Sequence, residues 1–214
     1  MPRTALTRLT EKASDDRRSL DALLDESRVC HIGLVADGHP VVVPTGIARD
    51  GDRVLIHGST GSRWMRLLAA GADASLAVTA LDALVVARSA FESSMRYRSA
   101  VLFGTFTTVS AGQDTLKALD ALTDSLLPGR VQEVRRPSVK ELAATLVLAM
   151  PIVEWSLKGS DEWPEDPPDD VAGEAWAGVV PLHFVARDPL PSPDLRPGVA
   201  VPRSVRILSG EGRT

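Results

Sequence analysis

Short β-branched segments separated by Asp-Gly pairs dominate the first third of this chain, and their spacing restricts the possible folds more than any other feature. Residues 28–35 alternate apolar and polar side chains, and the Asp-Gly pair 37–38 separates them from the apolar segment 40–48. A second Asp-Gly pair, 50–51, precedes the segment 53–58. Such a pair between two alternating segments is a strong signal for a β-hairpin. We therefore predict an antiparallel meander of three strands.

The rest of the chain adds more strands and a few helices. Further strands are expected at residues 74–81, 84–91, 99–109, 152–158 and 176–186. Helices are expected at residues 15–26 with Ser14 as N-cap, at 63–71 and 112–129, and at 138–150 with Ser138 and Glu141 as a capping box. Because strands and helices do not alternate, a doubly wound parallel sheet is disfavoured. The pattern predicts a mainly β fold, a β-barrel with flanking helices.

The length of 214 residues fits one domain, 1–214. We expect the barrel core and its helices at about 15–158. The remainder, 159–214, contains an acidic, proline-rich loop, a late strand and a C-terminal tail. Three of the four tryptophans fall at Trp155, Trp163 and Trp176. They either anchor the tail on the barrel or cover a flat ring.

Composition excludes several classes of partner and site. The net charge of −4 argues against a nucleic acid or an anionic membrane as the main partner. The one cysteine, Cys30, allows no internal disulfide, and its strand context predicts a small buried hydrophobe. The N-terminus shows no signal-peptide pattern, and the longest apolar run, 142–153, is too short to span a bilayer. We therefore expect a cytoplasmic protein.

The junction between the strand ending near residue 58 and the helix expected from residue 63 concentrates groups that bind anions. The hydroxyls belong to Ser59, Thr60 and Ser62, the glycines are Gly58 and Gly61, and the arginines are Arg63 and Arg66. Glycines let backbone N–H groups approach a ligand, and a helix N-terminus together with an arginine favours phosphate. The structural alternative is an ordinary N-cap followed by an arginine. Neither a P-loop nor a G-x-G-x-x-G motif is present, which argues against a nucleoside triphosphatase or a dinucleotide dehydrogenase.

Two other features bear on function. Residues 87–104 crowd arginines and serines between two apolar strands, which suits an anionic or heteroaromatic ligand or, equally, a solvated hairpin. No metal-ligand spacing connects the four histidines, which are His31, His39, His57 and His183. His57 adjoins the predicted phosphate site, so it is the candidate to donate to a bound ring or to act as a catalytic proton donor.

Ordered pieces of the chain between residues 15 and 186 resemble the flavin-nucleotide-binding relatives of pyridoxamine 5′-phosphate oxidase, close to the group that includes nitroimidazole-resistance proteins. The pieces are CHIGLVADGHPVVVPTGIARDGD, IHGSTGSRWMRLL, VVARSAFESSMRYRSAVLFG, LLPGR, ELAATLVLAMPI and WAGVVPL. The resemblance implies a six-stranded antiparallel split β-barrel that forms a homodimer with FMN at the subunit interface. It also implies a small-molecule substrate and NAD(P)H as a possible reductant.

The resemblance also implies roles for individual residues. The strand through Val43, Pro44 and Thr45 would lie along the isoalloxazine ring, and His57, Gly58 and Ser59 would end the neighbouring strand beside the ring or the ribityl chain. Ser62 and Arg63 match the pair that binds the FMN phosphate. Ser99 matches a polar position that faces the partner's flavin, and Trp176 would lie near the flavin from the late loop.

The chain also departs from the family pattern. Trp64 follows the phosphate-binding arginine where the oxidase has a lysine, and Gly159 follows Lys158 where relatives have an arginine. The residues with which the oxidase holds pyridoxine phosphate have no counterpart in the late segment. The resemblance thus predicts flavin binding rather than vitamin B6 oxidation.

Three functional hypotheses follow from the sequence. The first is an FMN-dependent oxidoreductase acting on a small heteroaromatic or electrophilic substrate, with the redox chemistry supplied by the flavin. The second is a non-catalytic flavin-binding or sensor module. The third is the same fold with a deazaflavin or haem as cofactor.

Overall fold

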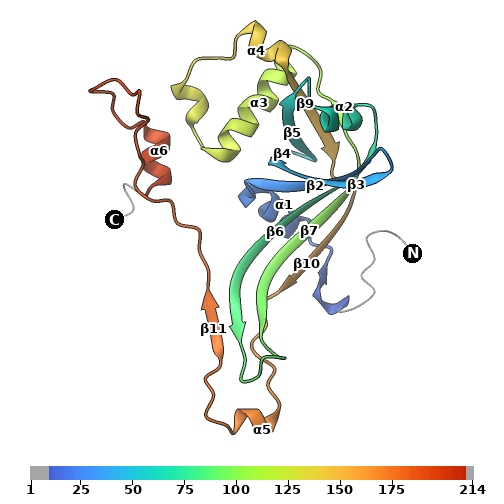
Figure 1. Cartoon of the computed structure of the whole chain (residues 1–214), viewed down its shortest axis with the longest axis vertical. Coiled ribbons are helices and arrows are strands. Elements are labelled where there is room, and N and C mark those ends of the chain that lie inside the picture. The colour runs from blue at the N-terminus through green and yellow to red at the C-terminus, as the bar shows by residue number, and fades with distance from the viewer. Residues whose placement is uncertain (1–9, 211–214) are drawn as a thin grey trace.

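Two antiparallel sheets form the centre of the molecule in the computed structural model, which describes residues 10–210 (Figure 1). The larger sheet has the strand order β1-β10-β7-β6-β2-β3, with β11 paired to the far half of β6. Its strands are β1 (Ala13–Ser14), β2 (Val29–Ala36), β3 (His39–Gly46), β6 (Asp73–Val86), β7 (Ser94–Thr105), β10 (Glu154–Ser160) and β11 (Gly178–Pro181). The smaller sheet, in the order β4-β5-β9-β8, contains β4 (Ala48–Asp50), β5 (Arg53–Ser59), β8 (Thr107–Thr108) and β9 (Thr145–Pro151).

Short helices flank these sheets. The α-helices are α1 (Arg17–Glu26), α2 (Arg63–Ala69), α3 (Gln113–Leu126), α4 (Val139–Ala144), α5 (Pro168–Val171) and α6 (Arg203–Leu208), and the 3-10 helices are η1 (Thr10–Lys12) and η2 (Arg130–Glu133). The expected mainly β split barrel with flanking helices is thereby confirmed. No helix in the described part is both long enough and apolar enough to cross a membrane.

The predicted three-strand meander is correct only for its two hairpins. β2 and β3 pair as expected, and Asp37 and Gly38 both adopt positive φ in their turn. β4 and β5 also pair, but they belong to the smaller sheet, so β3 and β5 are not hydrogen-bonded neighbours. The chain changes sheets at the buried Ile47. One edge of β3 is therefore left without a strand partner among the described residues.

Strands predicted at residues 74–81 and 84–91 are in fact one long strand, β6, and residues 87–91 form the turn beyond it. The pairing of β6 with β7 shifts by one residue between Leu81 and Ala83, which is a β-bulge. Asp82 occupies this bulge, and its carboxylate accepts two hydrogen bonds from the guanidinium of Arg98, at 2.9 and 2.7 Å. Asp82 therefore marks a bulge within one long strand and not a boundary between two strands.

The helix predicted at residues 138–150 ends early. Its capping box is confirmed, because Ser138 and Glu141 exchange side chain–backbone hydrogen bonds at the start of α4. After Ala144 the chain becomes β9, which lies between β5 and β8. A strand buried on both faces is apolar throughout, and its periodicity does not distinguish it from a buried helix. The N-cap of α1 also differs from the prediction, since the side chain of Asp16, and not that of Ser14, accepts hydrogen bonds from the first turn.

Two apolar clusters lie on opposite faces of the smaller sheet. The larger one fills the barrel and joins Leu20 and Leu24 of α1 to Met65 and Leu68 of α2. The smaller one lies beneath α3 and contains Leu122 of that helix. On β5 the side chains alternate between the two, with Val54 and Ile56 in the barrel and Leu55 beneath α3. By this alternation His57 and Ser59 point toward the α3 side.

The late strand is shorter than predicted. β11 ends at Pro181, and residues 182–202, which we call the C-terminal arm, form no helix or strand. The arm runs from β11 past the body of the molecule to α6, far from the tip of the β6–β7 hairpin (Figure 1). There Ser204 of α6 donates to Glu133 of η2 through both its backbone N–H and its hydroxyl. The arm is thus anchored at both ends.

Candidate cofactor site

The predicted phosphate site is a short loop between β5 and α2. Its backbone donors are largely used within the protein: the N–H of Thr60 donates to the carbonyl of Ala144 at 3.0 Å, and the N–H of Ser62 to that of Ser59 at 2.9 Å. The N–H of Gly61 donates to the hydroxyl of Ser59 at 3.1 Å. These three N–H groups therefore hold the loop in shape. α2 has only seven residues, so side chains are the main means of binding an anion here.

Two of those side chains are suitably placed. Ser62 is the N-cap residue of α2, yet its side chain makes no capping hydrogen bond, which leaves the hydroxyl free for a ligand. Arg63, the first residue of α2, forms an ion pair with Asp37 from the β2–β3 turn. One guanidinium has five N–H donors, so Arg63 can keep this contact and still donate to a phosphate. Sequence reasoning missed Asp37, because no local pattern connects the two residues.

One of the two glycines of the loop has a role in packing within the protein. A Cβ on Gly58 would lie 3.0 Å from Cγ of Met65, so Gly58 makes room for the packing of α2 against β5. At Gly61 a Cβ would lie 3.5 Å from the hydroxyl oxygen of Ser59, which is an ordinary contact. Close packing of α2 thus requires a residue without a side chain at position 58.

The strand expected along a flavin ring is an edge strand. Val43, Pro44 and Thr45 pair with Ile32, His31 and Cys30 of β2, and β3 has no strand on its other side in the described structure. Every second residue of an edge strand presents unpaired backbone N–H and C=O groups. Pro44 has no N–H, so at that residue the free edge of β3 presents only a carbonyl, which can accept a hydrogen bond from a flat heterocycle.

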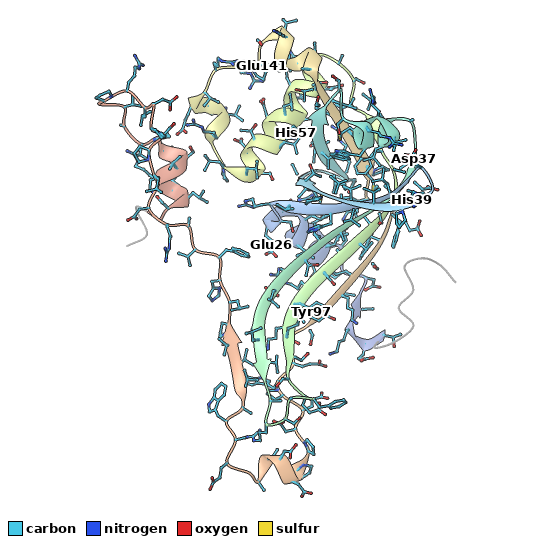
Figure 2. All side chains as sticks on the ribbon, in the orientation of Figure 1. Glu26, Asp37, His39, His57, Tyr97 and Glu141 are labelled. Atoms are coloured by element: carbon cyan, nitrogen blue, oxygen red, sulfur yellow. The ribbon has the colours of Figure 1, made fainter. Side chains whose placement is uncertain are left out.

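His57 lies on β5, opposite Val147 of β9, in a hollow beneath α3 and α4 (Figure 2). The hollow has a volume of about 440 Å³ and is open to solvent. Its other lining residues are Leu119, Thr123, Arg135, Pro137, Glu141, Leu142 and Thr145. Partial burial lowers the pKa of His57 below its ordinary value, which favours the neutral imidazole. No hydrogen bond to this ring is found in residues 10–210.

Ser99 and Trp176 are not brought to the phosphate loop within one chain. Ser99 is on β7, paired with Thr79 and Lys158, and belongs to the outer face of the larger sheet. Trp176 precedes β11 and covers Gly178, where a Cβ would come within 2.8 Å of the indole. β11 and α2 lie at opposite ends of the molecule (Figure 1). Within one chain Trp176 therefore does not belong to the site at this loop.

The arginines of residues 87–104 have structural partners. Arg88 binds the buried carboxylate of Asp166 through its backbone N–H at 2.8 Å and its side chain at 2.9 Å. Arg96 stacks over the ring of Trp163, 4.9 Å from its centroid. These contacts attach the acidic loop to the β6–β7 hairpin. Arg88 and Arg96 therefore hold the acidic loop in place, and Trp163 anchors that loop to the hairpin.

The described residues contain no group of three or more histidine, cysteine, aspartate or glutamate side chains that could hold a metal ion. Cys30 is fully buried in the barrel, as expected. Burial raises the pKa of its thiol to about 12. The described residues thus support neither a metal ion held by protein side chains alone nor a reactive thiolate at Cys30.

Comparison with known proteins places this arrangement in a family. The family model for pyridoxamine 5′-phosphate oxidase matches residues 16–159. The structure of the FAD and heme binding protein from Mycobacterium smegmatis is 53% identical, covers 92% of this chain and 97% of that protein, and has a TM-score of 0.89. The flavocytochrome Anf3 from Azotobacter vinelandii is 34% identical, covers 97% of each chain and also has a TM-score of 0.89.

More distant similarity concerns the fold alone. A candidate 5-nitroimidazole antibiotic resistance protein from Bacteroides thetaiotaomicron is 18% identical over 69% of this chain and 86% of that one, with a TM-score of 0.59. No curated protein sequence gives a significant match.

Proposed function

Because this chain belongs to the pyridoxamine 5′-phosphate oxidase family, we propose that it is an oxidoreductase that binds both a flavin and a haem. The observation that carries this proposal is the 53% identity, over 92% of the chain, to a protein that binds FAD and haem. The 34% identity to a flavocytochrome points the same way. Both relatives favour haem as a second cofactor, which the sequence alone offered only as an alternative to the flavin.

The flavin of the proposal is FAD, in place of the FMN expected from the sequence. The protein from M. smegmatis binds FAD, and no relative described above is an FMN protein by name. The residues present fit a flavin nucleotide: Ser62 has a free hydroxyl, Arg63 has donors to spare, and the edge of β3 has unpaired backbone groups. We assign the phosphates to Ser62 and Arg63 and the isoalloxazine ring to Val43–Thr45.

The proposal includes a homodimer. Apolar side chains on the outer face of the larger sheet are open to solvent, although a sheet normally buries such a face. They belong to Val29, Val35, Val42 and Leu81. The C-terminal arm adds exposed apolar side chains at Phe184, Val185 and Leu190. A second copy seated on this face would cover it, and could bring its own Ser99 and Trp176 toward the flavin.

Bound flavin would accept electrons in pairs from a donor such as NAD(P)H, and bound haem would carry them singly. The protein would hold the two groups in fixed positions and exclude water from them. A small-molecule acceptor or substrate is part of the proposal. The second candidate, a flavin-binding module without turnover, shares every binding residue and differs only in the absence of an acceptor reaction.

The first experiment is an absorbance spectrum of the protein purified from cells supplied with haem precursor, followed by mass identification of the released cofactors. Flavin bands together with a Soret band, and masses of FAD and haem, are expected. Reduction by NADH or NADPH and reoxidation by an acceptor would then separate the enzyme from the binding module. A protein that neither contains nor takes up flavin would refute the proposal.

A further inference from the structure

We propose that the imidazole of His57 would bind the haem iron and that the hollow beneath α3 and α4 is the haem site. The inference rests on the proposed function, since it assigns a place to one of its two cofactors. It goes beyond the earlier expectation that His57 acts as a proton donor beside the flavin. A nitrogen bound to iron has no proton to donate, so the two roles exclude each other at that atom.

The number of protein ligands is the first argument. The described residues offer no cluster able to bind a bare metal ion. A porphyrin supplies four nitrogen ligands itself, so one imidazole is enough to attach a haem. The imidazole must be neutral, accessible and not already engaged. His57 has no hydrogen-bond partner in the described structure, and it opens into a hollow instead of packing into the core.

The shape and chemistry of the hollow are the second argument. Its volume of about 440 Å³ lies within the roughly 300–1,000 Å³ of typical cofactor pockets. Leu119 and Leu142 provide apolar walls for a macrocycle, and Arg135 lies at the rim. Arg135 is exposed and forms a two-pronged ion pair with Glu141, at 2.6 and 2.8 Å. A guanidinium in that position can pair with a haem propionate.

The other histidines lack such surroundings. His31 lies on the outer face of β2, opposite Pro44 and Ala77. His39 is exposed at the start of β3, next to the β2–β3 turn (Figure 2). His183 is exposed in the C-terminal arm, two residues after β11. Neither His31, His39 nor His183 lines the hollow.

Position along β5 is the third argument. His57 is five residues before Ser62 and six before Arg63, the side chains assigned to the flavin phosphates. The same strand would therefore carry a ligand of one cofactor and lead directly into the site of the other. Cofactors that exchange electrons need such proximity, and a rigid strand paired along its length with β9 would fix it.

The test compares His57→Gly with a matched control, His39→Ala, in the full-length protein. Each is purified from cells supplied with haem precursor, and haem and FAD contents, the Soret spectrum and the thermal midpoint are measured. We expect the control to match the wild type. His57→Gly should lose at least 90% of its haem or show a clearly shifted Soret band, with FAD content unchanged. Added imidazole should restore the wild-type spectrum, because it can occupy the space of the deleted ring.

The outcomes separate this inference from the proposed function. If wild-type protein contains flavin and haem and His57→Gly keeps an unchanged Soret spectrum, the haem is held elsewhere and only this inference fails. Loss of both cofactors without rescue by imidazole would also overturn it, since His57 would then serve the flavin site. If the wild type takes up no haem, the haem part of the proposed function fails and this inference fails with it. His57→Gln provides the same test should the glycine variant fold poorly.

Discussion

Arg63 has two interactions to make, one with the proposed flavin phosphate and one with Asp37, and only the first could be predicted from the sequence. The proposal requires its guanidinium to bind a flavin phosphate, and the structure pairs it with Asp37. Both side chains are largely exposed, so the ion pair itself contributes little to stability. The carboxylate instead orients the guanidinium and, by its charge, weakens the attraction of a phosphate to the same place.

Replacement of Arg63 by alanine should therefore weaken FAD binding without unfolding the protein. A lost charged hydrogen bond costs about 1.5–3 kcal/mol, or roughly 10- to 150-fold in Kd. Fluorescence titration of apoprotein with FAD measures the change. Arg53→Ala, at the other end of β5, is the control and should bind FAD normally. Asp37→Asn should bind FAD as tightly as the wild type or more tightly. Unchanged affinity in Arg63→Ala would remove this residue from the flavin site.

Cys30 gives a prediction about pH. Its thiol has a pKa raised to about 12 by burial, whereas an unfolded thiol ionises near 9.0. The neutral thiol is thus favoured by folding: this contribution to stability is complete below pH 9 and is lost as the pH rises through the two values. At pH 8 a thiol reagent should label native protein negligibly and label denatured protein stoichiometrically. Rapid labelling of the native protein at pH 8 would contradict the burial of Cys30.

At the scale of elements, α1 depends on one capping residue. The carboxylate of Asp16 accepts from the backbone N–H of Arg18 at 3.0 Å and of Ser19 at 3.2 Å, and from the hydroxyl of Ser19 at 2.7 Å. These bonds, the one from the Ser19 hydroxyl foremost, lower the pKa of Asp16. α1 in turn buries Leu20, Leu23 and Leu24 completely or nearly so. The cap thus stabilises α1, and α1 supplies three leucines of the barrel core.

Asp16→Ala should lower the thermal midpoint at pH 7 by about 2–4 °C, as expected for loss of a cap in a protein of this length. Because the folded pKa is depressed, the contribution of Asp16 is present above its unfolded value of 3.8 and fades as the pH falls below it. The difference between wild type and variant should therefore shrink toward pH 2. Asp16→Asn, which retains the cap without the charge, should show a smaller loss at pH 7. A difference that persists undiminished at pH 2 would refute this account.

Elements with clear local signals were predictable, and those determined by distant partners were not. The β2–β3 and β4–β5 hairpins follow from Asp-Gly turns, and the start of α4 follows from its capping box. The segment of β9 has the pattern of a helix because both faces of the strand are buried by groups far away in the sequence. The same limit applies to the site. The loop at Ser62 and Arg63 was identified from its residues, but Asp37 and the hollow around His57 depend on tertiary contacts.

At the scale of the whole molecule, exposed apolar surface remains to be covered. In one chain the valines on the outer face of the larger sheet and the apolar side chains of the C-terminal arm are in contact with solvent. The side chain of Val42, for example, is 66% exposed. Water is an unfavourable environment for so much apolar surface. The arm is anchored at β11 and at α6 but carries exposed apolar groups between them. Both features are explained if a second copy lies against the sheet and the arm passes over it.

Introducing a charge on the outer face should therefore dissociate the proposed dimer. Sedimentation velocity should show wild-type protein at about twice the 22.8 kDa of one chain, and Val42→Glu as monomer. Val153→Glu, at a still more exposed position in the β9–β10 turn, should remain dimeric. The monomeric variant should also lose much of its flavin, since the partner's Ser99 and Trp176 would be absent from the site. Wild-type protein that sediments as a flavin-loaded monomer would refute both the dimer and the shared site, and would leave the arm to be explained by another partner.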